Sequence, residues 1–177
     1  MAEFDEILSE ELDRYERDTH KPELSLEALR VPLSAIGAAK VETLPLGASV
    51  EQAVRIIQQP GTSCVAITDH AQRLVGLITE RDLCTRIVSK GIDPRSARVE
   101  EIMTKDPLAL RSDHPLTFAL AQLDVGGYRH IPLVDRDHHP VGVVTARRVI
   151  NYLVEFFPDE VKGLPPRPLT SAEQHGG

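Results

Sequence analysis

Hydrophobic residues recur along this chain with two different periods, and each change of period predicts a change of secondary structure. In residues 3–18 the apolar side chains lie three and four positions apart among charged ones, which predicts an amphipathic helix that ends at the Lys21-Pro22 step. This helix needs an apolar surface, which its own domain, a second copy of the chain or another protein can supply. Its apolar stripe consists of Phe4, Ile7, Leu8, Leu12 and Tyr15.

Farther along the chain, short apolar runs bounded by turn residues alternate with segments of helical period. They predict a turn or short helix, a strand, a helix, two strands and a helix, at residues 32–36, 41–44, 49–59, 64–68, 74–78 and 79–88. The same order returns at residues 99–103, 108–110, 115–125, 130–134, 141–144 and 145–156. Ser49 suits the N-cap of the helix at residues 49–59, and Asp113 or His114 suits that of the helix at residues 115–125. Each half reads β-α-β-β-α, so the expected fold class is α+β.

The two halves form a tandem repeat. Residues 76–83 (GLITERDL) and residues 142–149 (GVVTARRV) are 66 positions apart, and the same shift without a gap pairs Gly61 with Gly127 and Asp69 with Asp135. One difference between the copies bears on function, because the position of Asp82 in the first copy holds arginine in the second.

The T-x-x-D turn at Thr79 predicts a strand that runs directly into a helix. The Thr79 hydroxyl can accept a hydrogen bond from the free amide of Asp82, and the Asp82 carboxylate lies in the first helical turn, where the helix dipole favours it. An isolated T-x-x-D is explained by a plain helix N-terminus. Recurrence of the whole segment at a fixed offset is what points to a site here.

Composition and charge narrow the class of protein. A hydrophobic content of 41% over 177 residues is enough for a globular core. No apolar run approaches the roughly 18 residues of a membrane span and the start of the chain does not resemble a signal peptide, so a soluble, cytoplasmic protein is expected. Residues 1–30 hold ten acidic and four basic residues, and therefore −6 of the net charge of −7. The absence of a basic stripe and of aromatic stacking residues argues against nucleic-acid binding.

The sequence contains no catalytic constellation, and the protein is not expected to be an enzyme. There is no nucleophile elbow, no glycine-rich phosphate loop with a lysine and no tuned pair of carboxylates. Cys64 and Cys84 are expected to be buried free thiols. His138 and His139 have no partner acids at a recognisable ligand spacing, so exposed turn residues are expected and no metal site.

The sequence resembles a pair of CBS motifs, the tandem arrangement known as a Bateman module. The resemblance rests on GLITERDL, GVVTARRV, EIMTKDPLAL and GYRHIPLVD, the last two at residues 101–110 and 127–135. It implies two pseudo-symmetric repeats packed through their sheets, with two clefts that can each take an adenosine-type ligand. Those ligands are AMP, ADP, ATP, S-adenosylmethionine or, less often, a cyclic dinucleotide, acting as regulatory ligands and not as cofactors. The expected domains are an acidic helical extension, repeat one, a connector, repeat two and a proline-rich, flexible tail, at residues 1–30, 31–90, 91–98, 99–157 and 158–177.

Carried over to this sequence, the resemblance implies one complete cleft. In it Asp82 accepts hydrogen bonds from the ribose hydroxyls and Thr79 faces the sugar-phosphate, while Lys105, Arg129 and His130 offer positive charge for a phosphate. Tyr128, Arg129 and His130 also have ordinary structural explanations, as a core aromatic, a solvated arginine and a satisfied histidine. The expected ligand-binding residues are Thr79, Arg81, Asp82, Thr104, Lys105, Pro107, Tyr128, Arg129, His130 and Ile131, with Glu80 and Asp106 beside them.

The other cleft departs from the family pattern. Arg148 stands where a ribose-binding acid is needed, and a guanidinium cannot accept a hydrogen bond from a hydroxyl. This cleft is therefore expected to be empty or to hold a ligand by phosphate contacts alone. Its residues would be Lys40, Val41, Thr62, Ser63, Cys64, Thr145 and Arg148.

Two functions from different classes follow. The first is a stand-alone, homodimeric regulatory module that senses an adenosine nucleotide through a ligand-dependent change of repeat or dimer arrangement and acts on a protein partner. The alternative is a ligand-free dimerisation scaffold that docks a partner through its N-terminal helix. An RNA-binding or single-strand-binding module is a third, less favoured interpretation.

Overall fold

The computed structural model describes residues 25–156, so the predicted amphipathic helix and proline-rich tail lie outside the described residues. Residues 26–150 form one compact unit that contains the sheets of both repeats, whereas Ser25 and residues 151–156 fall in a second unit. None of the helices within the described residues is long and apolar enough to cross a membrane.

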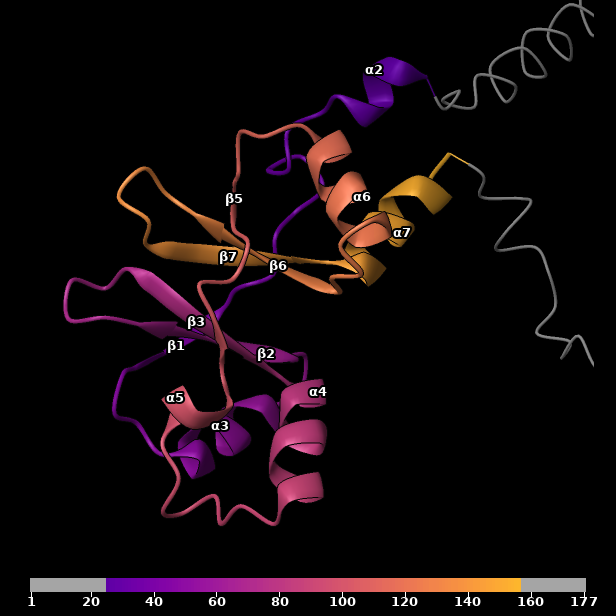
Figure 1. Ribbon diagram of the computed structural model, residues 1–177. Helices are drawn as coiled ribbons and strands as arrows, with labels where there is room; N and C mark the ends of the chain where they lie inside the picture. The colour runs from indigo at the N-terminus through magenta and orange to yellow at the C-terminus, as the bar shows by residue number, and fades with distance from the viewer. Residues whose placement is uncertain (1–24, 157–177) are drawn as a thin grey trace, which may run out of the picture. The chain divides into compact units, whose positions relative to one another are not determined.

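Two small sheets form the centre of the unit (Figure 1). In the first, β1 (Glu42–Pro45) is parallel to β2 (Cys64–Thr68), which is antiparallel to β3 (Leu74–Thr79). In the second, β5 (Leu110–Arg111) is parallel to β6 (His130–Val134), which is antiparallel to β7 (Pro140–Thr145). Both hairpins carry a register shift at the same repeat position, between Ile67 and Thr68 and between Leu133 and Val134. The strands therefore confirm the predicted α+β repeat pair.

The helices lie on the outer sides of the two sheets in Figure 1. α3 (Val50–Ile57) begins at the predicted N-cap Ser49, which forms a capping box: the Ser49 hydroxyl accepts from the backbone amide of Gln52 at 3.3 Å, and Gln52 Oε1 accepts from the backbone amide of Ser49 at 2.9 Å. The helical elements are α2 (Leu26–Leu29), α3 (Val50–Ile57), α4 (Glu80–Asp82), a π-helical turn (Leu83–Ile87), a 3₁₀ turn (Val88–Lys90), α5 (Val99–Ile102), α6 (Leu116–Asp124) and α7 (Ala146–Val154).

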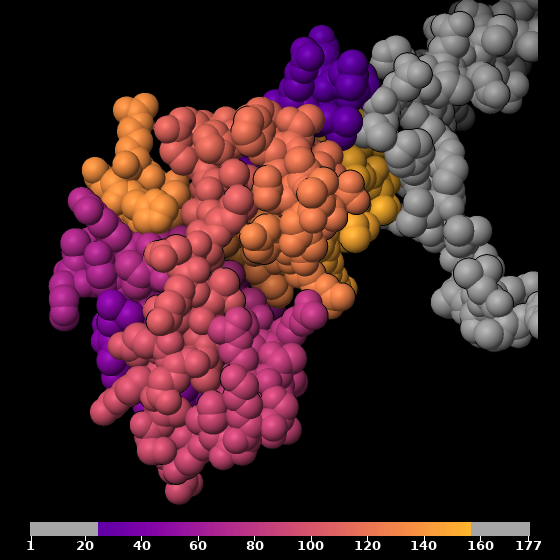
Figure 2. Space-filling view, viewed as in Figure 1, coloured from indigo at the N-terminus to yellow at the C-terminus, as the bar shows by residue number. Residues whose placement is uncertain are grey.

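Each sheet is extended by a segment near the start of the other repeat. β4 (Thr104–Lys105), near the start of repeat two, pairs with β3 of repeat one, with Leu77 opposite Thr104. In the second sheet, Ala39 from the start of repeat one exchanges two backbone hydrogen bonds with Val143 of β7, at 3.0 and 2.9 Å. Figure 2 shows the segment after α5 on the molecular surface, running from repeat one to repeat two. Because of these pairings, residues of each repeat lie beside a strand of the other repeat.

Buried apolar side chains pack on both faces of the first sheet. One cluster packs α3 and α5 against the first sheet and includes Val50, Ile67 and Ile102. A second cluster lies between the repeats, because Val41, Cys64, Ala66, Leu74 and Leu77 of repeat one share it with Val134 and Val143 of repeat two. Burying these faces against each other is what makes the pair of repeats a single folding unit.

Three local predictions were wrong. Residues 79–88 were expected as one α-helix, but the helix changes to a π turn directly after Asp82. Neither Asp113 nor His114 caps α6, because Pro115 itself occupies the N-cap and the Asp113 carboxylate pairs with Arg111 at 2.7 Å. Cys84 was expected to be buried and is exposed.

Gly76 allows the first residues of repeat two to lie close to β3. A Cβ added at Gly76 would collide with the Met103 side chain and lie 3.2 Å from Ile67 Cβ. We expect Gly76→Ala to lower the free energy of unfolding by about 1–3 kcal/mol through overpacking. Chemical denaturation measures the loss, and Gly76→Ala should cost less in a Met103→Ala background because the two sites are in contact. Equal costs in both backgrounds would contradict the explanation.

Candidate functional site

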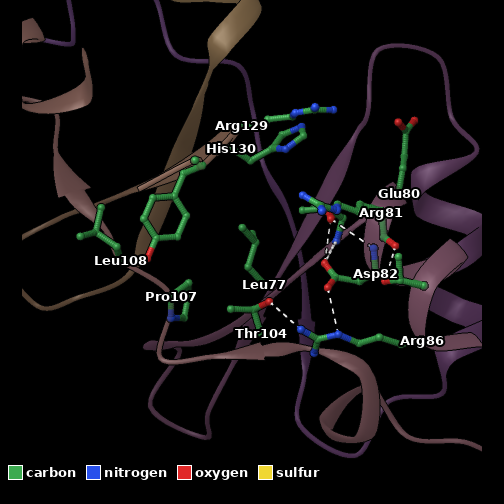
Figure 3. Close-up of a pocket in the computed structure, with 14 residues that line it drawn as sticks. Leu77, Glu80, Arg81, Asp82, Arg86, Thr104, Pro107, Leu108, Arg129 and His130 are labelled. Atoms are coloured by element: carbon green, nitrogen blue, oxygen red, sulfur yellow. Dashed lines mark hydrogen bonds and ion pairs between the residues drawn. The ribbon is translucent and has the colours of Figure 1, made fainter. Parts of the chain in front are cut away.

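A cleft with a volume of about 450 Å³ lies between the two repeats. Figure 3 shows the α4 side chains on one side of it and Pro107 and Leu108 on the other. Its lining residues come from β3, α4, the π turn, β4, the first residue of β6 and the segments before β5 and β6. They are Leu77, Thr79, Glu80, Arg81, Asp82, Thr85, Arg86, Thr104, Pro107, Leu108, Gly127, Tyr128, Arg129 and His130.

Thr79 and Asp82 form a reciprocal capping box at the start of α4. The Asp82 amide donates to Thr79 Oγ1 at 3.4 Å, as predicted, and Asp82 Oδ2 accepts from the Thr79 amide at 2.9 Å and from the Thr79 hydroxyl at 2.7 Å. The box fixes the Asp82 side chain in one orientation. With 8% of its surface exposed, Asp82 is one of two buried polar or charged residues among those that the structure describes.

The second oxygen of Asp82 faces Arg86. Asp82 Oδ1 lies 3.2 Å from Arg86 Nε, and the same guanidinium donates to the backbone carbonyls of Ile102 and Met103 at 2.9 and 2.7 Å. Its remaining nitrogen lies 3.3 Å from Thr104 Oγ1. A buried carboxylate is stable only when it is paired and hydrogen-bonded, and Asp82 meets this condition through Thr79 and Arg86.

Repeat two supplies the other wall. Tyr128 follows the Gly126-Gly127 turn after α6, is 41% exposed, and lines the cleft together with Pro107 and Leu108. Gly127 has a φ of +64°, a conformation that glycine adopts without strain and that sets the direction of the chain before Tyr128. This side of the cleft is thus apolar and aromatic at Pro107, Leu108 and Tyr128, with Arg129 and His130 beside them, whereas the α4 side is charged.

His130 connects the cleft to repeat one. Its Nε2 atom lies 2.8 Å from Ser63 Oγ. Burial lowers the pKa of His130 from 6.5, and the positive charge of Arg129 acts in the same direction, while Glu80 and Asp82 oppose the shift. His130 is therefore held in its neutral form at neutral pH.

Most of the predicted residues of the complete cleft are brought together. Lys105, Asp106 and Ile131 are the exceptions, since none of them lines the cleft, and the Ile131 side chain is fully buried. Sequence reasoning missed Leu77, Thr85, Arg86, Leu108 and Gly127. Of these only Arg86 carried a signal, because an arginine four positions after an aspartate on a helix can pair with it.

Residues predicted for the other cleft are placed differently, and none of them lines the cavity described above. Val41 and Cys64 pack in the apolar cluster between the repeats, and Lys40 pairs with Glu42 at 2.8 Å. Thr62 is half-buried, and Ser63 contacts His130 of the complete cleft. Thr145 Oγ1 accepts from the Arg148 amide at 3.2 Å, and the Arg148 side chain is exposed.

One cluster of potential metal ligands lies outside the cleft, in the turn between β6 and β7. Ligand atoms of Asp135, Asp137 and His139 lie within 4.8 Å of one another. The Asp135 carboxylate accepts from the backbone amides of Asp137 and His139 at 2.9 and 2.8 Å, and His139 Nδ1 lies 3.0 Å from it. These contacts hold the pKa of Asp135 below, and that of His139 above, its ordinary value. They account for the cluster as a hydrogen-bonded turn.

The CBS domain family profile matches residues 34–89 and 99–155, which together make up more than half of the chain. A CBS domain-containing protein of Arabidopsis thaliana, CBSCBSPB3, is 31% identical over 97 residues, which cover 55% of this chain and 17% of that protein. A homoserine O-acetyltransferase of Methanohalobium evestigatum is 28% identical over 124 residues, 70% of this chain and 24% of that enzyme. The chain thus spans a quarter or less of these two relatives.

Solved structures share the fold. The CBS domain pair of protein MJ0100, in complex with 5′-methylthioadenosine and S-adenosyl-L-methionine, superposes with a TM-score of 0.62 at 22% identity, over 70% of this chain and 96% of that one. CBSX2 in complex with AMP gives a TM-score of 0.60 at 19% identity, over 71% of this chain and 97% of that one.

The buried His130 makes stability depend on pH in a defined direction. Because the folded-state pKa lies below the unfolded value of about 6.5, the unfolded chain binds the proton more readily. Stability should therefore fall as pH drops through 6.5 toward the folded-state pKa, and His130 should contribute nothing to this change well above pH 6.5. His139, whose pKa is raised, acts in the opposite direction in every variant that retains it.

Denaturation at about pH 7.5 and about pH 5.5 tests this prediction. We expect His130→Gln to lose less of its free energy of unfolding on acidification than the wild type. His70→Gln, at an exposed position, should behave like the wild type. The same acid-induced loss in His130→Gln as in the wild type would refute the role given to burial.

Proposed function

We propose, from the premise that this chain belongs to the CBS domain family, that it is a regulatory module that binds an adenosine-type nucleotide between its repeats. The candidate ligands are AMP, ADP, ATP and S-adenosylmethionine. The observation that carries the proposal is the buried carboxylate of Asp82 at the wall of a cleft of about 450 Å³. Support comes from proteins of the same fold that hold AMP, 5′-methylthioadenosine or S-adenosylmethionine.

Asp82 has one position left for a ribose hydroxyl. Its Oδ2 accepts two hydrogen bonds from Thr79 and its Oδ1 faces Arg86, so three of the roughly four lone-pair positions of a carboxylate are used. The remaining position on Oδ1 would accept from the ligand in a charge-assisted hydrogen bond. Because the capping box already fixes the side chain, little conformational entropy is lost on binding.

The other lining residues suit the remaining parts of a nucleotide. Tyr128, Leu77, Pro107 and Leu108 offer an aromatic and apolar surface for the base. Arg81 and Arg129 line the cleft and form no ion pair with any of the described residues, so both are available to a phosphate. The predicted ligand-binding role of Lys105 would need a different side-chain position, because Lys105 does not line this cleft.

Ligand binding would act by shifting a conformational equilibrium. Residues of both repeats line the cleft, so a ligand would favour the relative orientation in which both walls contact it. It can shift the equilibrium only by the difference between its affinities for the two orientations. We place this activity in the cytoplasm, where the two free cysteines would remain reduced.

A homodimer is part of the proposal, and the exposed face of α6 supports it. Phe118 on α6 and its C-cap residue Val125 are 51% and 88% exposed. The positions 66 residues earlier hold Gln52, on α3, and Gln59, just after it. Exposed apolar side chains at these positions of repeat two, where repeat one has glutamines, fit a two-fold interface formed by repeat two.

Isothermal calorimetry with each of the four ligands tests the ribose contact. We expect the wild type to bind at least one of them and Asp82→Asn, which keeps the side-chain volume, to bind about tenfold or more weakly, since a charge-assisted hydrogen bond is lost. Asp124→Asn, at an exposed position on α6, serves as the control. Unchanged affinity in Asp82→Asn would show that the ribose is elsewhere, and failure of all four ligands to bind the wild type would overturn the function.

Stoichiometry tests the difference between the repeats. We expect one tightly bound ligand per chain, because Arg148 replaces the acid in the second cleft and cannot accept from a ribose. Arg148→Asp should allow a second, weaker binding event in the same titration. Two equivalent sites in the wild type would contradict the role given to Arg148.

A further inference from the structure

Arg86 joins three parts of the chain through one guanidinium group. Arg86 lies in the π turn after α4. Its guanidinium group pairs with Asp82 Oδ1 at 3.2 Å and donates to the backbone carbonyls of Ile102 and Met103 at 2.9 and 2.7 Å. The contact with Thr104 Oγ1, at 3.3 Å, adds a residue of the cleft wall. Figure 3 shows Arg86 between Asp82 and Thr104.

The two carbonyl groups belong to the end of α5. Ile102 is its last residue and Met103 its C-cap, and carbonyls at a helix C-terminus have no amide partner within the helix. A cation at this end is favoured by both hydrogen bonding and the helix dipole. Since α5 leads directly into β4, Arg86 of repeat one fixes residues 99–105, the first residues of repeat two.

The pair of Asp82 and Arg86 occurs in one repeat and is wholly absent from the other. The positions 66 residues later hold Arg148 and Tyr152, so repeat two has neither the acid nor the base. The backbone differs as well, because α7 continues as a regular α-helix where repeat one has the π turn. Single π turns inside helices are rare and are frequent at functional sites.

We propose that Arg86 is a positioning residue that orients Asp82 for the ligand and transmits occupancy of the cleft to residues 99–105. This inference rests on the proposed function. Oδ1 of Asp82 is both the atom that faces Arg86 and the atom with an open lone pair. A ligand hydroxyl that donates to Oδ1 withdraws negative charge from Arg86, and this strengthens the competing contacts of Arg86 with the carbonyls of Ile102 and Met103. Residues 99–105 are then held more tightly when the cleft is occupied.

Arg86→Lys is the variant that separates this role from a merely structural one. A lysine ammonium can pair with Asp82, but it is a point charge and cannot span the carboxylate, two carbonyls and a hydroxyl at once. Arg86→Leu removes the charge altogether. Arg55→Leu is the matched control, because Arg55 on α3 is 72% exposed and pairs only with Glu51 in the part of the chain that the structure describes.

The measurement is amide hydrogen exchange of residues 99–105 by mass spectrometry, in the full chain, without ligand and with saturating AMP or S-adenosylmethionine. Calorimetry on the same samples gives the affinity. In the wild type and in Arg55→Leu we expect ligand to slow exchange in this segment by about tenfold. In Arg86→Lys we expect the ligand to bind and the exchange rates to stay within about twofold of the ligand-free values. Arg86→Leu should also bind about tenfold more weakly, because Asp82 is no longer held.

The outcomes distinguish the two proposals. If the wild type binds neither probe, the proposed function fails, and this inference fails with it. If the wild type binds and Arg86→Lys slows exchange as much as the wild type does, the proposed function stands and the inference is overturned. Faster ligand-free exchange in Arg86→Lys together with a full response to ligand would likewise overturn it, since that is the behaviour of a purely structural anchor.

Discussion

The pairing of β4 with β3 is the constraint on which the cleft depends. Two backbone-paired positions, Leu77 with Thr104 and Gly76 with Lys105, attach the first residues of repeat two to the sheet of repeat one. The turns at Thr79 and Thr145 follow strands of two separate small sheets, each too small to bury its own faces, and this attachment links repeat two to the sheet that carries Thr79. With it, Thr104 lies beside the helix start that carries Asp82, and the chain continues to Pro107 and Leu108 on the opposite wall.

The charged side chains make the two repeats unequal, although the backbones at these positions are alike. The backbone hydrogen bonds that begin the last helix of each repeat are equivalent, since Glu80 donates to the Ser63 carbonyl and Ala146 to the Arg129 carbonyl. The side chains placed by this common backbone are not equivalent. Asp82 is buried and twice partnered, whereas Arg148, at the matching position, is exposed. A scaffold duplicated in this way can therefore place an acceptor of hydrogen bonds on one side only.

Much of the fold could be predicted from the sequence because the same order of predicted strands and helices occurs in both copies, so each copy supports the prediction made for the other. β2 and β6 agree with the predicted strands at both ends, and most of the residues expected in the cleft line it. The failures have local physical causes. β4 has only two residues and no periodicity to detect, and the π turn leaves the residue pattern of a helix unchanged. Leu108 and Gly127 line the cleft because of the path that the backbone takes, and residue type alone does not predict that path.

The burial of Cys64 has a consequence for oxidative chemistry. Desolvation raises the pKa of this thiol to about 12, so at neutral pH only about one molecule in 10⁵ carries the thiolate that peroxides and alkylating reagents attack. Cys84 lies exposed two residues after Asp82. Labels directed at sulfur will therefore attach to the outer side of this helix and leave the interior between the repeats chemically intact.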